Sequence, residues 1–360
     1  MVKSNNASHM TKTAGKSTDE SLLLTIEDLK VYYDTVSGVS KAVDSVSLRI
    51  KRGEILGIAG ESGCGKSTLT TALLRLTQRP GYIAGGAIHF YPQEKGPIDL
   101  LTVSGEQLRA IRWRNLSYLP QGSMNSLNPV LRIADQFCDA ILEHSQMSRR
   151  EALNIVSDLL QQVGLEPHVA RMYPHELSGG MKQRVTIAMA IALRPDLVIA
   201  DEPTTALDVH NQRIIIQMLS ELRDKLRMTI ILVTHDMAVH AELADRIAVM
   251  YAGTLVEVGD VRQIFKAPKH PYTQGLINSI PQIGGQRVRM EGIRGNTPSP
   301  RNWPAGCRFH TRCTHVMPEC REKVPQLLTI ANEQDAQSKQ PTLVACHLYT
   351  QFGAGGTHDN

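Results

Sequence analysis

The sequence lacks a long apolar run, has little net charge and contains no internal repeat. The longest apolar segments, Val185–Leu193 and Ile247–Val256, end at charged residues and are much shorter than the roughly 18 residues of a membrane-spanning helix. Lys and Arg number 39 against 35 Asp and Glu, so the net charge is +4. That bias is too weak for a dedicated nucleic-acid or polybasic membrane protein. We therefore expect no membrane span and no nucleic-acid partner.

The first 20 residues are small and polar and lack the apolar segment that a secretory signal contains. Ser8-His9-Met10 resembles an expression-vector remnant, which makes Met10 a candidate native start. We expect no secretory signal, and we expect residues 1–20 and 351–360 to be tails outside the fold.

The rest of the chain has a globular composition, with 42% apolar and 21% charged residues. At about 150 residues per domain, its length predicts two or three domains. Short apolar runs of the kind found in buried parallel strands alternate with helical stretches, which predicts an α/β fold. The expected strands are Ile55–Ala59, Leu116–Leu119, Leu197–Ala200 and Thr229–Val233. The expected helices are Ser67–Leu76, Ile133–Glu143, Arg149–Val163, Gly180–Leu193 and Asn211–Leu226.

The alternation extends over residues 21–266, which we expect to form one domain. Its first two strands, Leu22–Tyr33 and Lys41–Ile50, should form a smaller antiparallel β layer. Residues 122–194 carry helical patterns and no convincing strand, so they should project as a helical subdomain. Residues 267–350 are rich in Pro and Gly at first, which indicates a turn-rich connector that leads into a small C-terminal module.

Four of the six cysteines lie in this C-terminal extension, with the spacing C-x5-C-x6-C-x25-C. They are Cys307, Cys313, Cys320 and Cys346. A segment as short as 306–347 buries little surface by itself, so we expect it to need a stabilising cross-link. Four thiolates suit an iron–sulfur cluster or a tetrahedral Zn²⁺ site. The close cysteine pair that usually begins a structural zinc site is missing, and unligated or disulfide-linked cysteines are a third alternative.

A phosphate-binding motif follows the first predicted core strand. It reads Gly60-Glu61-Ser62-Gly63-Cys64-Gly65-Lys66-Ser67-Thr68 and matches G-x-x-x-x-G-K-[ST]. Glycines let successive backbone N–H groups converge on phosphate oxygens, and the N-terminus of the following helix adds positive potential. Lys66 would place a charge between the β- and γ-phosphates, and the Ser67 hydroxyl would bind Mg²⁺. We expect Cys64 to be a small filler and not a nucleophile.

Two acidic residues follow the strand that ends at Ala200. Ligands of α/β sheets gather at the carboxyl ends of strands, so we expect both residues to lie in the site. Asp201 suits a water-mediated contact to Mg²⁺, and Glu202 suits a general base that polarises the attacking water. Paired acids alone are weak evidence, but together with the glycine loop they predict nucleotide hydrolysis.

Four further motifs, in this order, resemble those of the ATP-binding-cassette (ABC) ATPases. They are a glutamine loop (Tyr118-Leu119-Pro120-Gln121), a signature sequence (Leu177-Ser178-Gly179-Gly180-Met181-Lys182-Gln183), a D-loop (Ala206-Leu207-Asp208) and a switch histidine (Thr234-His235-Asp236). With the two motifs above, the resemblance covers about residues 22–266. It implies a P-loop ATPase core that binds ATP and Mg²⁺ in a head-to-tail dimer.

The resemblance also implies a role for individual residues. His235 would reach the γ-phosphate, and Gln121 would contact Mg²⁺ and sense that phosphate. Tyr33 matches the aromatic that stacks on adenine, although Tyr32 is adjacent and a tyrosine of the β-layer core is the alternative. Ser178, Gly179 and Gly180 would contact the nucleotide of the partner subunit. From the residues alone, Ser178 is equally a simple helix cap.

The C-terminal extension resembles that of dipeptide and oligopeptide importer ATPases. The match is carried by Lys269-His270-Pro271-Tyr272-Thr273-Gln274-Gly275-Leu276, by Gly306–Cys313 and by Pro318-Glu319-Cys320-Arg321. It implies a peripheral subunit at the cytoplasmic face of the inner or plasma membrane. Its partners would be a second, paralogous ATPase, two permeases and an extracytoplasmic solute-binding protein.

The same resemblance favours a [4Fe–4S] cluster at the four cysteines, with Zn²⁺ as the alternative. Importers of oligosaccharides, nickel or glutathione belong to the same branch, so the solute stays open. A soluble ABC ATPase that clamps nucleic acid and a regulator that binds nucleotide without turnover are the other functions considered. The single cassette argues against the first, and Glu202 and His235 argue against the second.

Overall fold

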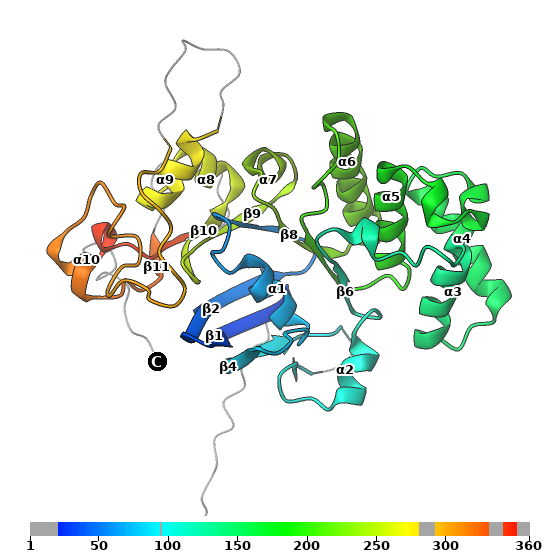
Figure 1. Cartoon of the computed structure of the whole chain (residues 1–360), viewed down its shortest axis with the longest axis horizontal. Helices are drawn as coiled ribbons and strands as arrows, with labels where there is room; N and C mark the ends of the chain where they lie inside the picture. Colours follow the sequence, from blue (N-terminus) through cyan, green and yellow to red (C-terminus); the bar gives the residue numbers. More distant parts are fainter. Residues whose placement is uncertain (1–20, 94–95, 281–291, 331–340, 351–360) are drawn as a thin grey trace, which may run out of the picture.

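The computed structural model describes residues 21–93, 96–280, 292–330 and 341–350 and contains two β-sheets with helices around them (Figure 1). The larger sheet has the strand order β11-β12-β10-β9-β3-β8-β7-β6, and the smaller has the order β2-β1-β4-β5. The smaller sheet contains β1 (Leu22–Thr35), β2 (Gly38–Lys51), β4 (Gly81–Phe90) and β5 (Ile98–Asp99). Its strands are antiparallel, which confirms the predicted β layer.

The centre of the larger sheet is parallel, as the apolar runs predicted. It contains β3 (Ile55–Ala59), β6 (Leu116–Leu119), β7 (Leu197–Asp201), β8 (Thr229–Val233) and β9 (Arg246–Tyr251). β3 lies between β8 and β9, and β7 lies between β6 and β8. Every residue of β3, β7 and β8 is buried, because helices or the β layer cover both faces. β10 (Thr254–Asp260) pairs antiparallel with β9.

The α-helices of the described residues are α1 (Lys66–Leu73), α2 (Gly105–Ile111), α3 (Ile133–His144), α4 (Arg149–Gln162), α5 (Gly179–Ala190), α6 (Val209–Leu226), α7 (Met237–Leu243), α8 (Val261–Lys266), α9 (Pro271–Asn278) and α10 (Pro318–Glu322). Five of the helices, α1 and α3 to α6, follow the predicted stretches and differ by a few residues at their ends, whereas α2 and α7 to α10 were not predicted. Ser148 caps α4 and Asp208 caps α6, each by accepting a backbone N–H of the first turn. Such caps satisfy donors that the helix itself leaves unpaired.

The stretch from α3 to α5 is wholly described and contains helices and no strand. Buried side chains of these helices, such as Phe137, Val156 and Val185, form one apolar core with β7 and α6. In Figure 1 these helices lie at one end of the long axis of the molecule, and α10 lies at the other.

The C-terminal segment, predicted as a small module, joins the edge of the larger sheet. β12 (Thr342–Val344) pairs with β10 through Glu257–Val344 and Val258–Leu343, and β11 (Leu328–Ile330) pairs with β12. Tyr272 and Phe309 also pack on Tyr251 of β9, with ring centroids 4.6 and 5.2 Å away. The segment gains its apolar burial by extending the main sheet, which is how so short a stretch becomes stable.

Several expectations fall on residues outside the described part of the chain. The tails 1–20, with Ser8-His9-Met10, and 351–360 are among them, as are Pro281, Gly284 and Gly285 of the connector. Among the residues that are described, no helix is both long and apolar enough to cross a membrane.

Candidate functional site

The site forms where the parallel strands of the larger sheet end. β3, β8, β7 and β6 are neighbours in that order, so the segments that follow them meet at one edge of the sheet. The glycine loop follows β3, Glu202 follows β7, His235 follows β8 and Gln121 follows β6. Residues from four distant parts of the sequence are therefore brought together by strand order.

The glycine loop has the backbone geometry that the motif predicts. Gly60, Gly63 and Gly65 all have positive φ, at 149°, 79° and 108°. A Cβ on Gly60 would lie 2.3 Å from the carbonyl oxygen of Met250, and one on Gly65 would lie 2.3 Å from that of Ala42. Side chains are excluded at these points both by conformation and by space.

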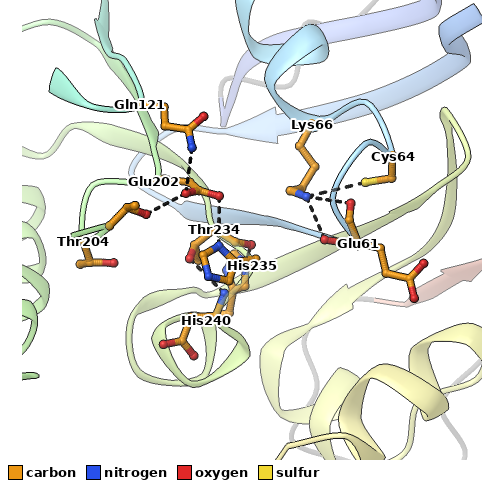
Figure 2. Close-up of polar contacts among 12 residues, drawn as sticks. Glu61, Cys64, Lys66, Gln121, Glu202, Thr204, Thr234, His235 and His240 are labelled. Carbon is orange, nitrogen blue, oxygen red and sulfur yellow. Dashed lines mark hydrogen bonds and ion pairs between the residues drawn. The ribbon is translucent and has the colours of Figure 1, made fainter. Parts of the chain in front are cut away.

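Lys66 begins α1, and its side chain turns back over the loop. Its Nζ donates to the carbonyl oxygens of Gly60 at 2.8 Å and Glu61 at 3.1 Å. Cys64 is fully buried beneath it, and burial raises the pKa of the Cys64 thiol. That thiol is therefore a packed, protonated group, as expected from the sequence. Figure 2 shows Cys64 and Lys66 on this loop, across from Glu202.

Asp201 ends β7 and is 1% exposed. Its Oδ2 accepts a hydrogen bond from the Tyr118 hydroxyl at 3.2 Å, while its Oδ1 has no hydrogen-bond partner among the described residues. Burial raises the pKa of Asp201, and hydrogen bonds from Ser67 and Tyr118 oppose that shift. A buried carboxylate oxygen without a partner, beside the Ser67 hydroxyl, is an oxygen donor set that fits Mg²⁺ and its water ligands.

Glu202 is the centre of a polar cluster at the sheet edge. His235 Nδ1 lies 3.0 Å from its Oε1, and Gln121 Nε2 and Thr205 Oγ1 donate to its Oε2 at 3.2 and 2.7 Å. Burial raises the pKa of Glu202, but the hydrogen bonds from Thr205 and His235 and the nearby positive charge outweigh it. The pKa therefore lies below its usual value. Figure 2 shows Gln121 and His235 directed at this carboxylate, which is ionised near neutral pH.

His240 holds the segment that carries His235. It is buried against Gly57 of β3, and its Nε2 lies 3.2 Å from the carbonyl oxygen of Thr234. Burial lowers the pKa of His240 to about 4, so the imidazole is neutral in the folded protein. Sequence analysis did not single out this residue, because a lone histidine in a helix gives no indication of burial.

This shift predicts acid sensitivity. Below its ordinary pKa of 6.5, His240 takes up a proton in the unfolded chain and not in the folded one. The contribution of neutral His240 to the stability of the fold is therefore fully present above pH 6.5 and is lost as the pH falls towards 4. The free energy of unfolding should decrease by roughly 3 kcal/mol over that range. Urea denaturation at a series of pH values measures it. His240→Leu should flatten the curve, and His168→Leu, at an exposed position, should leave it unchanged. Equal curves for all three proteins would contradict the prediction.

The two adjacent tyrosines of β1 point to different partners. Tyr33 Oη lies 3.4 Å from Thr68 Oγ1 at the start of α1, whereas Tyr32 Oη donates to Asp44 at 2.7 Å. Tyr33 therefore borders the glycine loop, while Tyr32 is tied to β2. The tertiary contacts thus separate two residues that the sequence pattern left ambiguous.

The signature segment is a capped helix start. Ser178 accepts the Met181 N–H at 3.3 Å, and Gly180 is packed so close to Asn211 that a Cβ would lie 2.6 Å from its Oδ1. Among the described residues, no hydrogen bond or ion pair joins Ser178, Gly179 or Gly180 to the glycine loop. Figure 1 shows α5 on the far side of β6 from α1. Within one chain, the signature therefore does not complete the site around Lys66.

The four C-terminal cysteines are free thiols; Cys320 and Cys346 are buried, and Cys307 and Cys313 are partly buried. The Cys307 N–H donates to the Cys320 carbonyl oxygen at 2.8 Å, and the His315 N–H donates to Cys313 Sγ at 3.3 Å. Burial raises the pKa of Cys307 and of Cys346 to about 11. In the described part of the chain, however, no three His, Cys, Asp or Glu side chains form a group that could hold a metal ion. The four cysteines of the predicted metal site thus share one segment of the chain, but their side chains do not form a metal site in this structure.

Three residues at the glycine loop and the acidic pair were not expected from the sequence. Tyr118, which contacts Asp201, belongs to the glutamine-loop motif, but no role was assigned to its side chain. Thr205, which contacts Glu202, directly precedes the D-loop motif and belongs to none of the motifs identified. Arg312 contacts Glu61 of the glycine loop from the cysteine segment. No sequence pattern connects two residues so far apart.

Comparisons with known proteins agree with this geometry. The family model described as ABC transporter matches residues 43–205, and the one described as oligopeptide/dipeptide transporter, C-terminal region, matches residues 256–320. The dipeptide transport ATP-binding protein DppD of Caldanaerobacter subterraneus subsp. tengcongensis is 43% identical, covering 92% of this chain and 98% of the relative. The oligopeptide transport ATP-binding protein AppD of Bacillus subtilis is 40% identical, covering 93% and 99%.

Solved structures agree as well. A dimeric structure of the ATP-binding cassette MJ0796, in a post-hydrolysis state and bound to ADP and Pi, has a TM-score of 0.59 and 28% identity. It covers 67% of this chain and 99% of the cassette. CbiO1 of Clostridium perfringens, part of the transporter complex cbiONQ, has a TM-score of 0.57 and 28% identity over 69% of this chain and 92% of its own.

Proposed function

Because this chain belongs to the ABC transporter ATPases, and its relatives over nearly the whole length are peptide transport subunits, we propose that it hydrolyses ATP to drive a dipeptide or oligopeptide importer. The observation that carries this proposal is the convergence of Gln121, Glu202 and His235 at the edge of the sheet that bears the glycine loop. A loop that binds phosphate and a carboxylate ready to accept a proton are the two parts that hydrolysis needs.

In the proposed reaction, the amides of the glycine loop and Lys66 bind the phosphates, and Tyr33 stacks on the adenine. Glu202 accepts a proton from water as the water oxygen bonds to the γ-phosphorus and the bond to the β-phosphate oxygen breaks. His235 and Gln121, both in contact with Glu202, orient that water and the γ-phosphate. Ser67, Asp201 and Gln121 are the residues that would hold Mg²⁺, which neutralises the developing phosphate charge.

The site of one chain is incomplete, which supports a dimer. The free amides at the start of α5 favour an anion, yet they do not reach the glycine loop of the same chain. In a head-to-tail pair, Ser178, Gly179 and Gly180 would contact the nucleotide bound by the partner. We place a paralogous ATPase in that second position, so the pair is a heterodimer.

The remaining partners follow from the importer function. Peptide importers contain membrane-embedded permeases, and the segment Gly122–Pro129, next to Gln121, together with the helical stretch that follows it, would dock a cytoplasmic helix of a permease. Movement of the docked helix would then reach Gln121 directly. The subunit would sit at the cytoplasmic face of the membrane as a peripheral protein, and an extracytoplasmic binding protein would deliver the peptide.

Reconstitution tests the function and its alternatives together. The chain is assembled with the permeases and second ATPase encoded by neighbouring reading frames, and ATP hydrolysis is measured with binding protein loaded with a dipeptide or an oligopeptide. Peptide should stimulate hydrolysis. Stimulation only by an oligosaccharide, nickel or glutathione would move the substrate to another class, and hydrolysis that needs no membrane partners would oppose the importer role.

We also propose that Cys307, Cys313, Cys320 and Cys346 hold a [4Fe–4S] cluster, with Zn²⁺ as the alternative. Four free thiols gathered in one segment supply the usual donor set, and backbone N–H groups that point at sulfur are typical of such sites. The role would be structural or redox-sensing, because four protein ligands leave no open position.

Anaerobic purification tests this proposal. The protein should be brown and contain iron and acid-labile sulfide, and Cys320→Ser should lose both. Cys138→Ala is the matched control, because Cys138 is also buried but lies in α3, among the helices of the other end of the molecule. Stoichiometric zinc in place of iron would contradict the cluster assignment.

A further inference from the structure

The C-terminal region reaches the glycine loop at one residue, Glu61. The guanidinium of Arg312 binds its carboxylate through both nitrogens, with Nη1–Oε2 at 2.7 Å and Nη2–Oε1 at 3.0 Å. Thr297 Oγ1 donates to the same carboxylate at 2.6 Å. Two-point pairing of this kind restrains direction as well as distance. The side chain of a residue inside the phosphate loop is therefore held by a segment about 250 residues away.

Arg312 is itself held in place. Its side chain is only 5% exposed, its Nε donates to the carbonyl oxygen of Arg294 at 3.0 Å, and its guanidinium lies 5.7 Å from the ring centroid of Tyr251. A guanidinium with so many partners in a buried setting loses little freedom when it binds Glu61. It therefore acts as a rigid anchor for the loop.

The backbone of Glu61 is held as well. Its N–H donates to the hydroxyl of Tyr272 in α9 at 2.8 Å, and Tyr272 is fully buried. Its carbonyl oxygen accepts from Lys66 Nζ at 3.1 Å. Glu61 thus joins the C-terminal region, through both its carboxylate and its N–H, to the lysine that would bind the phosphates.

We propose that Arg312 is a positioning residue for the nucleotide loop, and that the C-terminal region sets the affinity of the cassette for nucleotide through Glu61. This rests on the proposed function, since it assumes that the loop binds ATP. Arg312 directly precedes Cys313, so the same short segment carries a thiol of the cysteine set and the anchor of the loop. A displacement of Cys313 would therefore also move Arg312, its neighbour in the chain, and with it the ion pair to Glu61.

This proposal predicts that loss of Arg312 affects nucleotide binding and the rate of hydrolysis differently. Glu61 contacts Lys66, whereas the proton acceptor Glu202 is held by His235, Gln121 and Thr205. Loss of Arg312 should therefore raise Kd and KM for nucleotide and leave kcat at saturating ATP nearly unchanged. That pattern is expected when the lost interaction stabilises the bound ground state and the transition state equally.

The experiment measures binding of Mg²⁺ with a non-hydrolysable ATP analogue to the full chain by calorimetry. Arg312→Ala and Glu61→Gln should each weaken binding about 5- to 30-fold, the range that a coupling of one to two kcal/mol gives. The double variant should be no weaker than the weaker single variant, because both remove the same interaction. Arg312→Lys should recover part of the affinity. Glu61→Gln keeps the shape of the side chain, so it tests the same ion pair even if Arg312→Ala fails to fold.

Arg308→Ala is the matched control. Arg308 lies in the same segment, its side chain is 16% exposed, and it pairs with Asp44 of β2 and not with the glycine loop. It should lower thermal stability without weakening nucleotide binding. Equal weakening by Arg308→Ala and Arg312→Ala, unchanged binding in Arg312→Ala, or additive effects in the double variant would each overturn the proposal. Absence of analogue binding by the unmodified chain would instead remove the proposed function itself.

Discussion

Glu202→Gln is expected to reduce ATP hydrolysis about 10²- to 10⁴-fold, the range typical for loss of a general base, while nucleotide binding is retained. Glutamine is nearly isosteric and can still contact Thr205 and Gln121, but it cannot take a proton from water. The lowered pKa of Glu202 means that the unmodified side chain is ready as a base at neutral pH. The effect should therefore appear in kcat and not in the affinity for ATP.

Steady-state phosphate release measures this effect, and size-exclusion chromatography with ATP and Mg²⁺ gives a second readout. With hydrolysis blocked, ATP should stay bound between two cassettes, so the variant should accumulate as a closed dimer. Glu242→Gln, at an exposed position of α7, is the control and should behave as the unmodified protein. Normal turnover in Glu202→Gln would remove Glu202 from the role of base.

Lys66→Ala is expected to weaken binding of Mg²⁺–ADP and Mg²⁺–ATP roughly 10- to 100-fold, the range that corresponds to one charge-assisted hydrogen bond to phosphate. Lys66 is buried, and its Nζ donates to Gly60 and Glu61. Its charge is therefore already directed into the loop, and within the described part of the chain no other lysine side chain is hydrogen-bonded to that loop.

Direct binding to the isolated chain measures this loss without any contribution from turnover. Lys225→Ala, at an exposed position near the end of α6, is the control for a general change of charge. If Lys66→Ala bound nucleotide as tightly as this control did, the phosphate-binding role of the loop would be wrong.

The local sequence pattern was sufficient to predict strands and helices wherever their burial and hydrogen bonding depend on residues close together in the chain. Ile55–Ala59 and Thr229–Val233 are strands with the predicted bounds, because a run of apolar residues between polar turns can be buried only in the sheet interior. The helix expected at Gly180–Leu193 is instead Gly179–Ala190, since Ser178 caps it one residue earlier and its backbone leaves the helix after Ala190. Helix ends depend on such contacts more than on periodicity.

The candidate site was predicted in its parts and not in its arrangement. Each motif marked its own residues, and the geometry shows that Gln121, Glu202 and His235 touch. The different contacts of Tyr32 and Tyr33, the anchoring of Glu61 and the burial of His240 could not be predicted, because each depends on side chains that are distant in sequence. The attachment of the C-terminal segment to the main sheet could not be predicted for the same reason, since nothing local indicates that β12 pairs with β10.

The sequence by itself determined the central strands and the helices between them, the glycine loop, and the chemical groups proposed to act on a nucleotide. It could do so because apolar periodicity and glycine conformation are properties of short stretches of chain. Only the tertiary structure decided that β3 lies between β8 and β9, that one chain leaves its signature helix away from its own glycine loop, and that Arg312 holds Glu61. Those features come from packing and ion pairing between segments that are far apart along the chain, and the sequence of neither segment indicates its partner.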